Sequence, residues 1–315
     1  MKKYLLIAAA LIAGIVSPLA GARDLVLGFS QLGAESAWRL ANTQSIQESA
    51  AAAKIQLKFA NADQKQENQI KAIRAFIQQK VDVIAFAPVV TTGWDEVLRE
   101  AQQAGIPVIL TDRSIETHDD GYYLSFLGAD FTEEGRRAGR WLLRNAPKTG
   151  EVRIVELQGS AGSAPAIERK RGFEEVIRAD PRFRIVRSQT ADFTFAKGKE
   201  VMASFLKAEG KGKIHVLYAH NDDMALGAIQ AIEEAGQAPA KDILVIGVDA
   251  VKSAFEAMAT GKMNVSVECN PLIGPQLMDL VRFAAEGKPM PKRVQTLEGV
   301  FPMEVAKREL PKRKY

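Results

Sequence analysis

The sequence predicts an α/β protein with two similar lobes, and two observations carry the prediction. Short apolar segments of strand length alternate with longer amphipathic segments of helix length along nearly the whole chain. This alternation favours parallel sheets with helical crossovers. The same alternation starts again near residue 131, after a complete first series. We therefore expect two Rossmann-like lobes, each with its own parallel sheet.

The first series contains five strands and three helices. Ile70, Ile73, Phe76 and Ile77 recur at helical spacing, which is typical of one buried helix face. The segment 81–87 is almost entirely apolar and ends at Pro88, as expected of a strand buried on both faces. The expected strands are 25–29, 55–60, 81–87, 106–110 and 123–127, and the expected helices are 37–54, 64–80 and 94–104.

The second series repeats this order. Its clearest unit is an apolar strand, 214–219, followed at once by a helix that Asn221 or Asp222 can cap and Gly236 can end. The other expected strands are 152–157, 183–188 and 243–248, and the other helices are 131–145, 164–179, 195–208 and 251–260. The final stretch breaks the rhythm, with a strand at 263–269, a helix at 271–286 and a strand at 294–301.

The first 22 residues have the pattern of a signal peptide. Lys2 and Lys3 precede an apolar stretch, 5–16, and Ala20-Gly21-Ala22 is typical of a cleavage site. The apolar stretch is shorter than the roughly 20 residues that a membrane-spanning helix needs. We expect export, cleavage after Ala22 and, because no cysteine follows that site, no lipid anchor.

The amino-acid composition further limits the classes of protein to which this chain can belong. Cys269 is the only cysteine, so the chain forms no intramolecular disulfide, and we expect it to be a small buried apolar residue. The net charge is only +4, and several basic residues gather after residue 306, where a solvated tail is expected. No recognition motif for nucleic acid accompanies them. The sequence also lacks the glycine-rich phosphate loops, the nucleophile elbow and the zinc motif of common enzymes. We therefore expect no catalysis, no cofactor and no metal.

Polar side chains follow several strands at the point where each ends. Asp112 and Arg113 follow 106–110, Asn221 follows 214–219, and Asp249 follows 243–248. In open α/β sheets ligands bind at this carboxyl edge. Charged planar groups suit sugar hydroxyls and aromatic rings suit the apolar sugar face. The full set of candidate ligand-binding residues is Glu35, Trp38, Arg39, Asp112, Arg113, Arg169, Phe193, Asn221, Asp249 and Glu268.

Each candidate also has a purely structural interpretation. Asn221 can be only a helix cap, and Asp112 and Arg113 can form only a local ion pair in a turn. Arg169 lies in the charged run Glu168–Arg171 and can be a solvated surface residue, while Trp38 can belong to the core.

Four blocks of the chain identify a family. AHNDDMALGAIQAI, IPVILTDRS, ELQGSAGSAPAIERKRGF and IGVDA resemble the periplasmic sugar-binding proteins of ABC importers, in the ribose and galactose group. FSQLGAESAWR, KQENQIKAIRAFI, APVVTTGW and YAHNDDM are most similar to the galactofuranose-binding type. The candidate residues from Trp38 to Glu268 fall on the family's sugar-contacting positions. Trp38-Arg39 replaces a phenylalanine pair of the ribose type, and Glu268 replaces a glutamine.

The resemblance implies a periplasmic binding protein fold of type I, with three hinge segments. They would lie near Gly128-Ala129-Asp130, Glu268-Cys269-Asn270 and 295–299. The N-terminal lobe would comprise 23–128 and 269–295, and the C-terminal lobe 129–268 and 296–315. The lobes of a monomer would close on a neutral sugar and deliver it to an ABC permease.

Other functions remain to be distinguished. A transcriptional regulator with the same core would need an N-terminal DNA-binding motif, where the signal peptide stands. An exported enzyme would convert its sugar. Binding of another monosaccharide, or delivery to a chemoreceptor, is compatible with the same residues.

Overall fold

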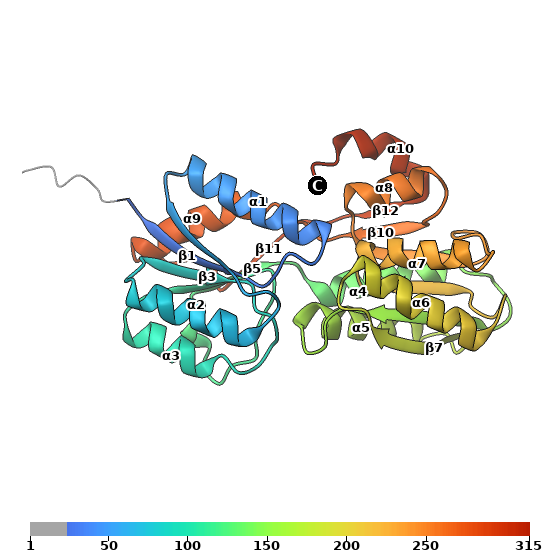
Figure 1. The fold of residues 1–315 in the computed structure, drawn as a ribbon, viewed down its shortest axis with the longest axis horizontal. Coiled ribbons are helices and arrows are strands. Elements are labelled where there is room, and N and C mark those ends of the chain that lie inside the picture. The colour runs from blue at the N-terminus through green and yellow to red at the C-terminus, as the bar shows by residue number, and fades with distance from the viewer. Residues whose placement is uncertain (1–23) are drawn as a thin grey trace, which may run out of the picture.

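Two α/β lobes lie side by side and are joined by crossing segments (Figure 1). The structure is a computed structural model that describes residues 24–315. The expected signal peptide, 1–22, and its cleavage site lie outside the described residues. No helix within 24–315 combines the length and the hydropathy that crossing a bilayer requires.

The N-terminal lobe contains a six-stranded parallel sheet in the order β11-β5-β4-β3-β1-β2. Helices α1 and α9 share one apolar cluster on one face of the sheet, the upper face in Figure 1, and α2 and α3 share a second cluster on the other face. The strands are β1 (Val26–Gln31), β2 (Gln56–Asn61), β3 (Val83–Phe86), β4 (Val108–Thr111), β5 (Ser125–Gly128) and β11 (Arg293–Gln295). The helices are α1 (Ala37–Ala52), α2 (Gln66–Gln78), α3 (Asp95–Gln103) and α9 (Gly274–Ala285).

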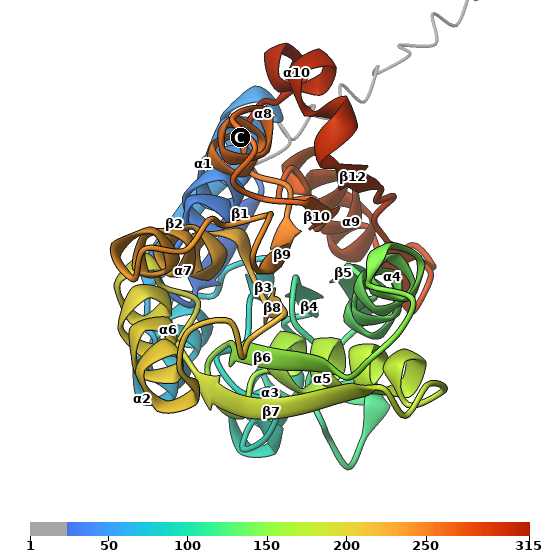
Figure 2. The ribbon, with the colours of Figure 1, turned by 90° about the vertical axis from the view of Figure 1, so that its right-hand side faces the viewer.

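The C-terminal lobe repeats this plan in the order β12-β10-β9-β8-β6-β7 (Figure 2). Its edge strand β12 is the exception to the expected parallel sheets, because it pairs antiparallel with β10. The strands are β6 (Val152–Gln158), β7 (Phe183–Thr190), β8 (Val216–Ala219), β9 (Leu244–Asp249), β10 (Val265–Glu268) and β12 (Val300–Pro302). The helices are α4 (Phe131–Asn145), α5 (Ala164–Ile177), α6 (Phe195–Glu209), α7 (Asp222–Glu234), α8 (Lys252–Ala259) and the short α10 (Ala306–Glu309).

The turn from β8 into α7 has the predicted form. Asn221 is the N-cap, and its Oδ1 accepts a hydrogen bond from Met224 N at 3.0 Å. Gly236 follows the helix with a φ of +68°, a conformation that glycine adopts without steric cost. This cap places the Asn221 side chain at the carboxyl edge of the second sheet.

The predicted strand at 294–301 was wrong. The structure has two short strands there, and they belong to different sheets. Arg293–Gln295 pairs with β5 in the N-terminal lobe, whereas Val300–Pro302 pairs with β10 in the C-terminal lobe. The residues between them cross from lobe to lobe, and Leu297 is 92% exposed there. Two further segments cross between the lobes, one after β5 and one after β10. The exact residues at which each lobe begins and ends stay a prediction.

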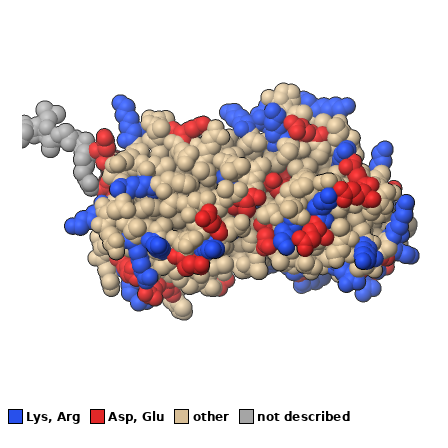
Figure 3. Space-filling model, in the orientation of Figure 1, with Lys and Arg blue, Asp and Glu red and all other residues tan. Residues whose placement is uncertain are grey.

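The C-terminal segment is not simply a solvated basic tail. Helix α10 packs against α8, and the Arg313 guanidinium lies 4.9 Å from the Phe255 ring centre and 5.0 Å from the Phe301 ring centre. Arg313 also forms an ion pair with Glu268 at 3.0 Å. Lys307, Arg308, Lys312 and Lys314 do remain exposed. On the face in Figure 3, charges of both signs are interspersed over both lobes.

Candidate functional site

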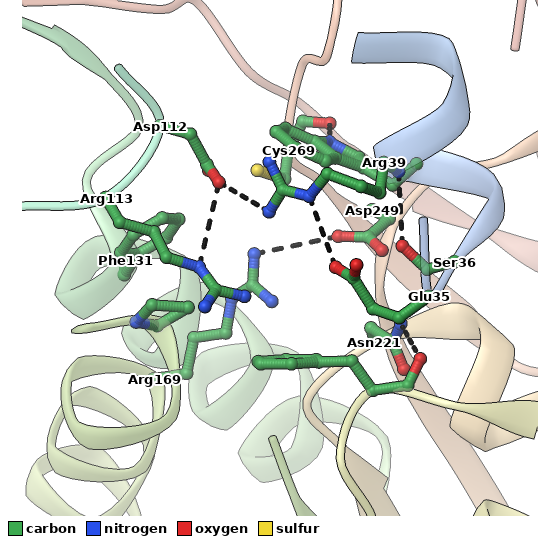
Figure 4. A pocket seen from close by; sticks show the side chains of 13 residues that line it. Glu35, Ser36, Arg39, Asp112, Arg113, Phe131, Arg169, Asn221, Asp249 and Cys269 are labelled. Atoms are coloured by element: carbon green, nitrogen blue, oxygen red, sulfur yellow. Dashed lines mark hydrogen bonds and ion pairs between the residues drawn. The ribbon is translucent and has the colours of Figure 1, made fainter. Parts of the chain in front are cut away.

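A cavity with about 290 Å³ of empty space lies between the two lobes (Figure 4). Nine of the ten predicted residues line it, and only Glu268 does not. The complete lining is Glu35, Ser36, Trp38, Arg39, Asp112, Arg113, Phe131, Pro165, Arg169, Phe193, Asn221, Asp249 and Cys269. Three arginines and three carboxylates therefore face one small space, and their formal charges cancel.

Arg39 is held by three acceptors of its own lobe. Its Nη2 donates to Asp112 Oδ2 at 2.6 Å, its Nε to Glu35 Oε1 at 3.2 Å and its Nη1 to Gln31 Oε1 at 3.2 Å. Burial opposes the charge of this side chain, but the two carboxylates outweigh burial, so the pKa of Arg39 is raised. The Glu35 carboxylate keeps one buried oxygen, Oε2, that has no hydrogen-bond partner within residues 24–315.

Arg113 is less well satisfied. It is 4% exposed, its Nη1 donates to Val89 O at 3.2 Å, and its Nε has no hydrogen-bond partner in the described part of the chain. The Asp112 carboxylate lies 3.7 Å from Nε, beyond normal hydrogen-bond length. Burial and the nearby charge of Arg39 lower the pKa of Arg113 to about 10. Because Arg113 Nε is buried without a hydrogen-bond partner, it is suited to donate a hydrogen bond to a ligand oxygen.

Arg169 approaches from the other lobe. Its Nε donates to Glu134 Oε2 at 2.7 Å, its Nη1 donates to His220 O at 2.6 Å, and its Nη2 lies 3.6 Å from Asp249 Oδ1. It is 3% exposed, which excludes the solvated-surface interpretation. In Figure 4, the Arg113 and Arg169 side chains point into the cavity from opposite lobes.

Aromatic rings complete the walls. Trp38 donates from Nε1 to Cys269 O at 2.7 Å and lies beneath the Arg39 guanidinium, 4.6 Å from its ring centre. Trp38 is 5% exposed, and it also joins the apolar cluster of the C-terminal lobe. The Phe193 ring lies directly against Gly159, where an added Cβ would be 1.8 Å from Phe193 Cζ. Glycine at 159 therefore leaves space for the ring.

Three cavity residues have left-handed backbone conformations. The φ angles are +60° at Asp112, +61° at Phe193 and +119° at Asp249. Such conformations are costly for residues other than glycine and concentrate at functional sites. Asp112 directly follows β4, and Asp249 is the last residue of β9. The strained turns therefore direct these two side chains into the cleft.

Glu268 does not line the cavity, and its predicted contact with the sugar stays a prediction. Its Oε1 accepts from Arg313 and Tyr315 at 3.0 Å, and its Oε2 accepts from Gly299 N at 3.0 Å. The next residue, Cys269, lines the cavity instead. Successive side chains of an extended segment point in opposite directions, so a shift of one residue selects the opposite face. Cys269 is buried, as expected.

Four cavity residues were not predicted from the sequence: Ser36, Phe131, Pro165 and Cys269. Ser36 caps α1 through its Oγ, which accepts from Arg39 N at 3.1 Å. A serine directly before a helix is a recognisable cap signal. Phe131 is the first residue of α4 and Pro165 the second residue of α5, and each resembles an ordinary helix-start residue in sequence.

The lobes are in contact across the cleft. Ala37 N donates to Asp223 Oδ2 at 3.2 Å, Thr91 N donates to Gly162 O at 3.0 Å, and Ser114 Oγ donates to Glu168 Oε1 at 3.3 Å. Each bond joins a residue of the N-terminal lobe to one of the C-terminal lobe. The structure is therefore in a closed conformation, which explains why the charged cavity residues are buried.

One group in 24–315 has the spacing of metal ligands: Glu134, Cys269 and Glu298, whose ligand atoms lie within 4.8 Å of one another. Each of the two carboxyl groups already has a partner through one of its oxygens. Glu134 pairs with Arg169, and Glu298 Oε1 accepts from Thr296 Oγ1 at 2.8 Å and from Asn270 N at 3.3 Å. The Arg169 guanidinium thus supplies the positive charge at this group.

Glu298 makes folding stability depend on pH. Burial, and then the charge of Glu134, raise its pKa to about 9, far above 4.5. The folded chain therefore holds a proton that the unfolded chain releases, and stability falls as pH rises from about 5 through about 9. We expect Glu298→Gln to reduce that loss by several kcal/mol between pH 5 and pH 9 in urea unfolding, because one unit of pKa shift corresponds to about 1.4 kcal/mol. The exposed Glu304→Gln variant is the control. Equal pH dependence in Glu298→Gln and the wild type would contradict the assignment.

Comparison with known proteins agrees with this architecture. The family model described as a periplasmic binding protein domain matches residues 27–289. The galactofuranose-binding protein YtfQ of Escherichia coli K12 is 48% identical over 316 residues, covering 100% of this chain and 99% of that protein. A Mycobacterium smegmatis structure in complex with β-D-fucofuranose is 55% identical, with a TM-score of 0.90 over 93% of this chain and 96% of that one.

A third relative is the periplasmic binding component of the arabinose ABC transporter from Shewanella sp. ANA-3, bound to α- and β-L-arabinofuranose. It is 48% identical, with a TM-score of 0.89 over 92% of this chain and 95% of that one. Three findings indicate the same family: the match to the family model, the near-complete coverage of these relatives and the two-lobe fold. The chain belongs to the periplasmic binding protein family.

Proposed function

We propose that this protein is the sugar-binding component of an ABC importer and that galactofuranose is its main ligand. It binds a neutral sugar between its lobes, closes, and delivers the sugar to a permease in the membrane. It makes and breaks no covalent bond. The nine predicted residues that line the cavity, together with Cys269, form the proposed binding site.

One observation carries the proposal. The closed cavity contains two buried polar atoms with no hydrogen-bond partner in the described residues, Glu35 Oε2 and Arg113 Nε. One is an acceptor and the other a donor. A hydroxyl can satisfy either, because it both donates and accepts. A buried polar atom without a hydrogen-bond partner costs free energy. A ligand whose hydroxyls bond to these two atoms therefore gains affinity.

The charge of the cavity supports a neutral ligand. The three lining arginines are balanced by Glu35, Asp112 and Asp249, so an anionic ligand would find no surplus positive charge. The furanose form is favoured because the similar proteins bear the names of galactofuranose, fucofuranose and arabinofuranose.

Export follows from the same proposal. The signal peptide would direct the chain to the periplasm, with cleavage after Ala22, and the mature protein would act there as a monomer. Intact mass of the exported protein tests the cleavage site. A species that retains residues 5–16 would contradict it.

The most direct experiment identifies the ligand that copurifies. Protein exported in its natural host is denatured, and released small molecules are analysed by mass spectrometry and NMR. We expect an intact neutral hexose with furanose signals. A chemically altered sugar after incubation would favour an exported enzyme, and an acidic ligand would overturn the proposal.

Closure provides a second test. We expect saturating galactofuranose to reduce the radius of gyration in small-angle scattering, because the lobes approach about the three crossings. The Thr91–Gly162 and Ala37–Asp223 contacts form only when the lobes meet. Identical scattering curves with and without bound sugar would refute ligand-driven closure.

A further inference from the structure

We propose that Glu134, which lies outside the cavity lining, positions the Arg169 guanidinium and sets the preference of the site for uncharged sugars. This inference rests on the proposed function and names a residue that determines its specificity. Glu134 is 0% exposed and lies on α4, while Arg169 lies on the neighbouring α5.

The geometry fixes the pair closely. Glu134 Oε2 accepts from Arg169 Nε at 2.7 Å, and His220 O accepts from Nη1 at 2.6 Å. The helices approach unusually near here: an added Cβ on Gly135 would lie 2.2 Å from Arg169 O. The guanidinium also lies 5.0 Å from the Phe131 ring centre. With Nε and Nη1 engaged, Nη2 remains near Asp249 at 3.6 Å and is free to bind a ligand oxygen.

Glu134 also controls the charge that a ligand meets. Burial opposes the charge of Arg169, but Glu134 and Asp249 outweigh burial and raise the pKa of Arg169, which therefore stays charged. Burial raises the pKa of both Glu134 and Asp249, but Glu134 lies 2.7 Å from the Arg169 guanidinium and Asp249 lies 3.6 Å from it. Glu134 is thus the principal counter-charge of Arg169. Without it, the buried site becomes more positive by one unit, and Coulomb interactions are strong at low dielectric.

The test compares two substitutions of Glu134 by calorimetric titration with galactofuranose and galacturonate. Glu134→Gln preserves the shape but removes the charge. We expect the ratio of the two dissociation constants to shift by about tenfold or more towards galacturonate, as one buried charge predicts. Glu134→Asp keeps the charge but shortens the side chain. We expect it to bind galactofuranose about tenfold more weakly, with the wild-type ratio retained.

Glu133→Gln is the matched control. It removes one negative charge from the adjacent residue of the same helix, where Glu133 pairs with Arg137 and Arg140 instead. Its affinities and their ratio should equal those of the wild type. A purely structural role for Glu134 would weaken both ligands in parallel in Glu134→Gln, and an unchanged ratio there overturns the inference.

Two results separate the possible failures. If Glu134→Gln is unfolded by circular dichroism, Glu134→Asp decides, because galactofuranose affinity equal to the wild type contradicts the positioning role. If the wild type itself binds neither sugar, the proposed function fails. If the wild type binds galactofuranose and the variants do not shift as stated, only the role of Glu134 fails.

Discussion

Replacing Arg113 by alanine should weaken sugar binding by about 10- to 150-fold, that is roughly 1.5–3 kcal/mol, without loss of stability in the sugar-free protein. The affinity falls because the ligand oxygens lose a charged donor in a buried site. Stability is maintained because Arg113 Nε has no hydrogen-bond partner in 24–315 and its charge is opposed by burial and by Arg39. Removing a poorly compensated charge should leave the melting temperature unchanged or higher.

Calorimetric titration measures the affinity, and thermal unfolding without sugar measures the stability. Arg99→Ala is the matched control, because Arg99 is an exposed arginine of the same lobe that contacts Tyr122. Binding by Arg113→Ala equal to that of the wild type would show that Arg113 is only a turn residue. Asn221 is a less informative target, since it caps α7 and donates to Phe193 O at 3.1 Å. Its replacement should lower both affinity and stability.

The largest expected effect concerns ligand charge. The wild-type protein should bind galactofuranose at least about 100-fold more tightly than galacturonate, because a buried carboxylate without a partner is costly. The lining carboxylates balance the arginines, and Glu134 adds a further negative charge behind Arg169. An anionic sugar therefore gains little attraction and loses its hydration.

Ribose should bind about tenfold or more weakly than galactofuranose for a different reason. A sugar with fewer hydroxyls leaves one of the unpaired atoms, Glu35 Oε2 or Arg113 Nε, without a partner. Titration with galactofuranose, galactopyranose, ribose, arabinose and galacturonate measures the order. Ribose binding most tightly, or galacturonate binding within tenfold of galactofuranose, would contradict the assignment.

The sequence by itself determined the α/β class, the two lobes and nine of the cavity residues. Apolar periodicity located the strands and helices because burial on one or both faces imposes that pattern. The polar residues after the strands could be identified because every parallel strand presents its carboxyl end at the same edge. The Asn221 cap was predictable from local chemistry alone, since a cap bonds within its own first turn.

Tertiary structure decided the features that depend on pairing between distant segments. Residues 294–301 have the apolar character of one strand, but β5 and β10 lie in different sheets and divide them. Glu268 and Cys269 are adjacent in sequence, and the contacts of Glu268 with Arg313 and Gly299 determine which of them faces the cavity.

The charge network was also decided only in three dimensions. Glu134 lies in a helix rich in charged residues, and nothing in its sequence context distinguishes it from half-buried Glu133. Its role arises because α4 packs against α5 and removes both Glu134 and Arg169 from water. The left-handed turns at Asp112, Phe193 and Asp249 likewise have no strong local signal. Long-range packing supplies the energy that holds these strained turns, so the sequence pattern alone could not reveal them.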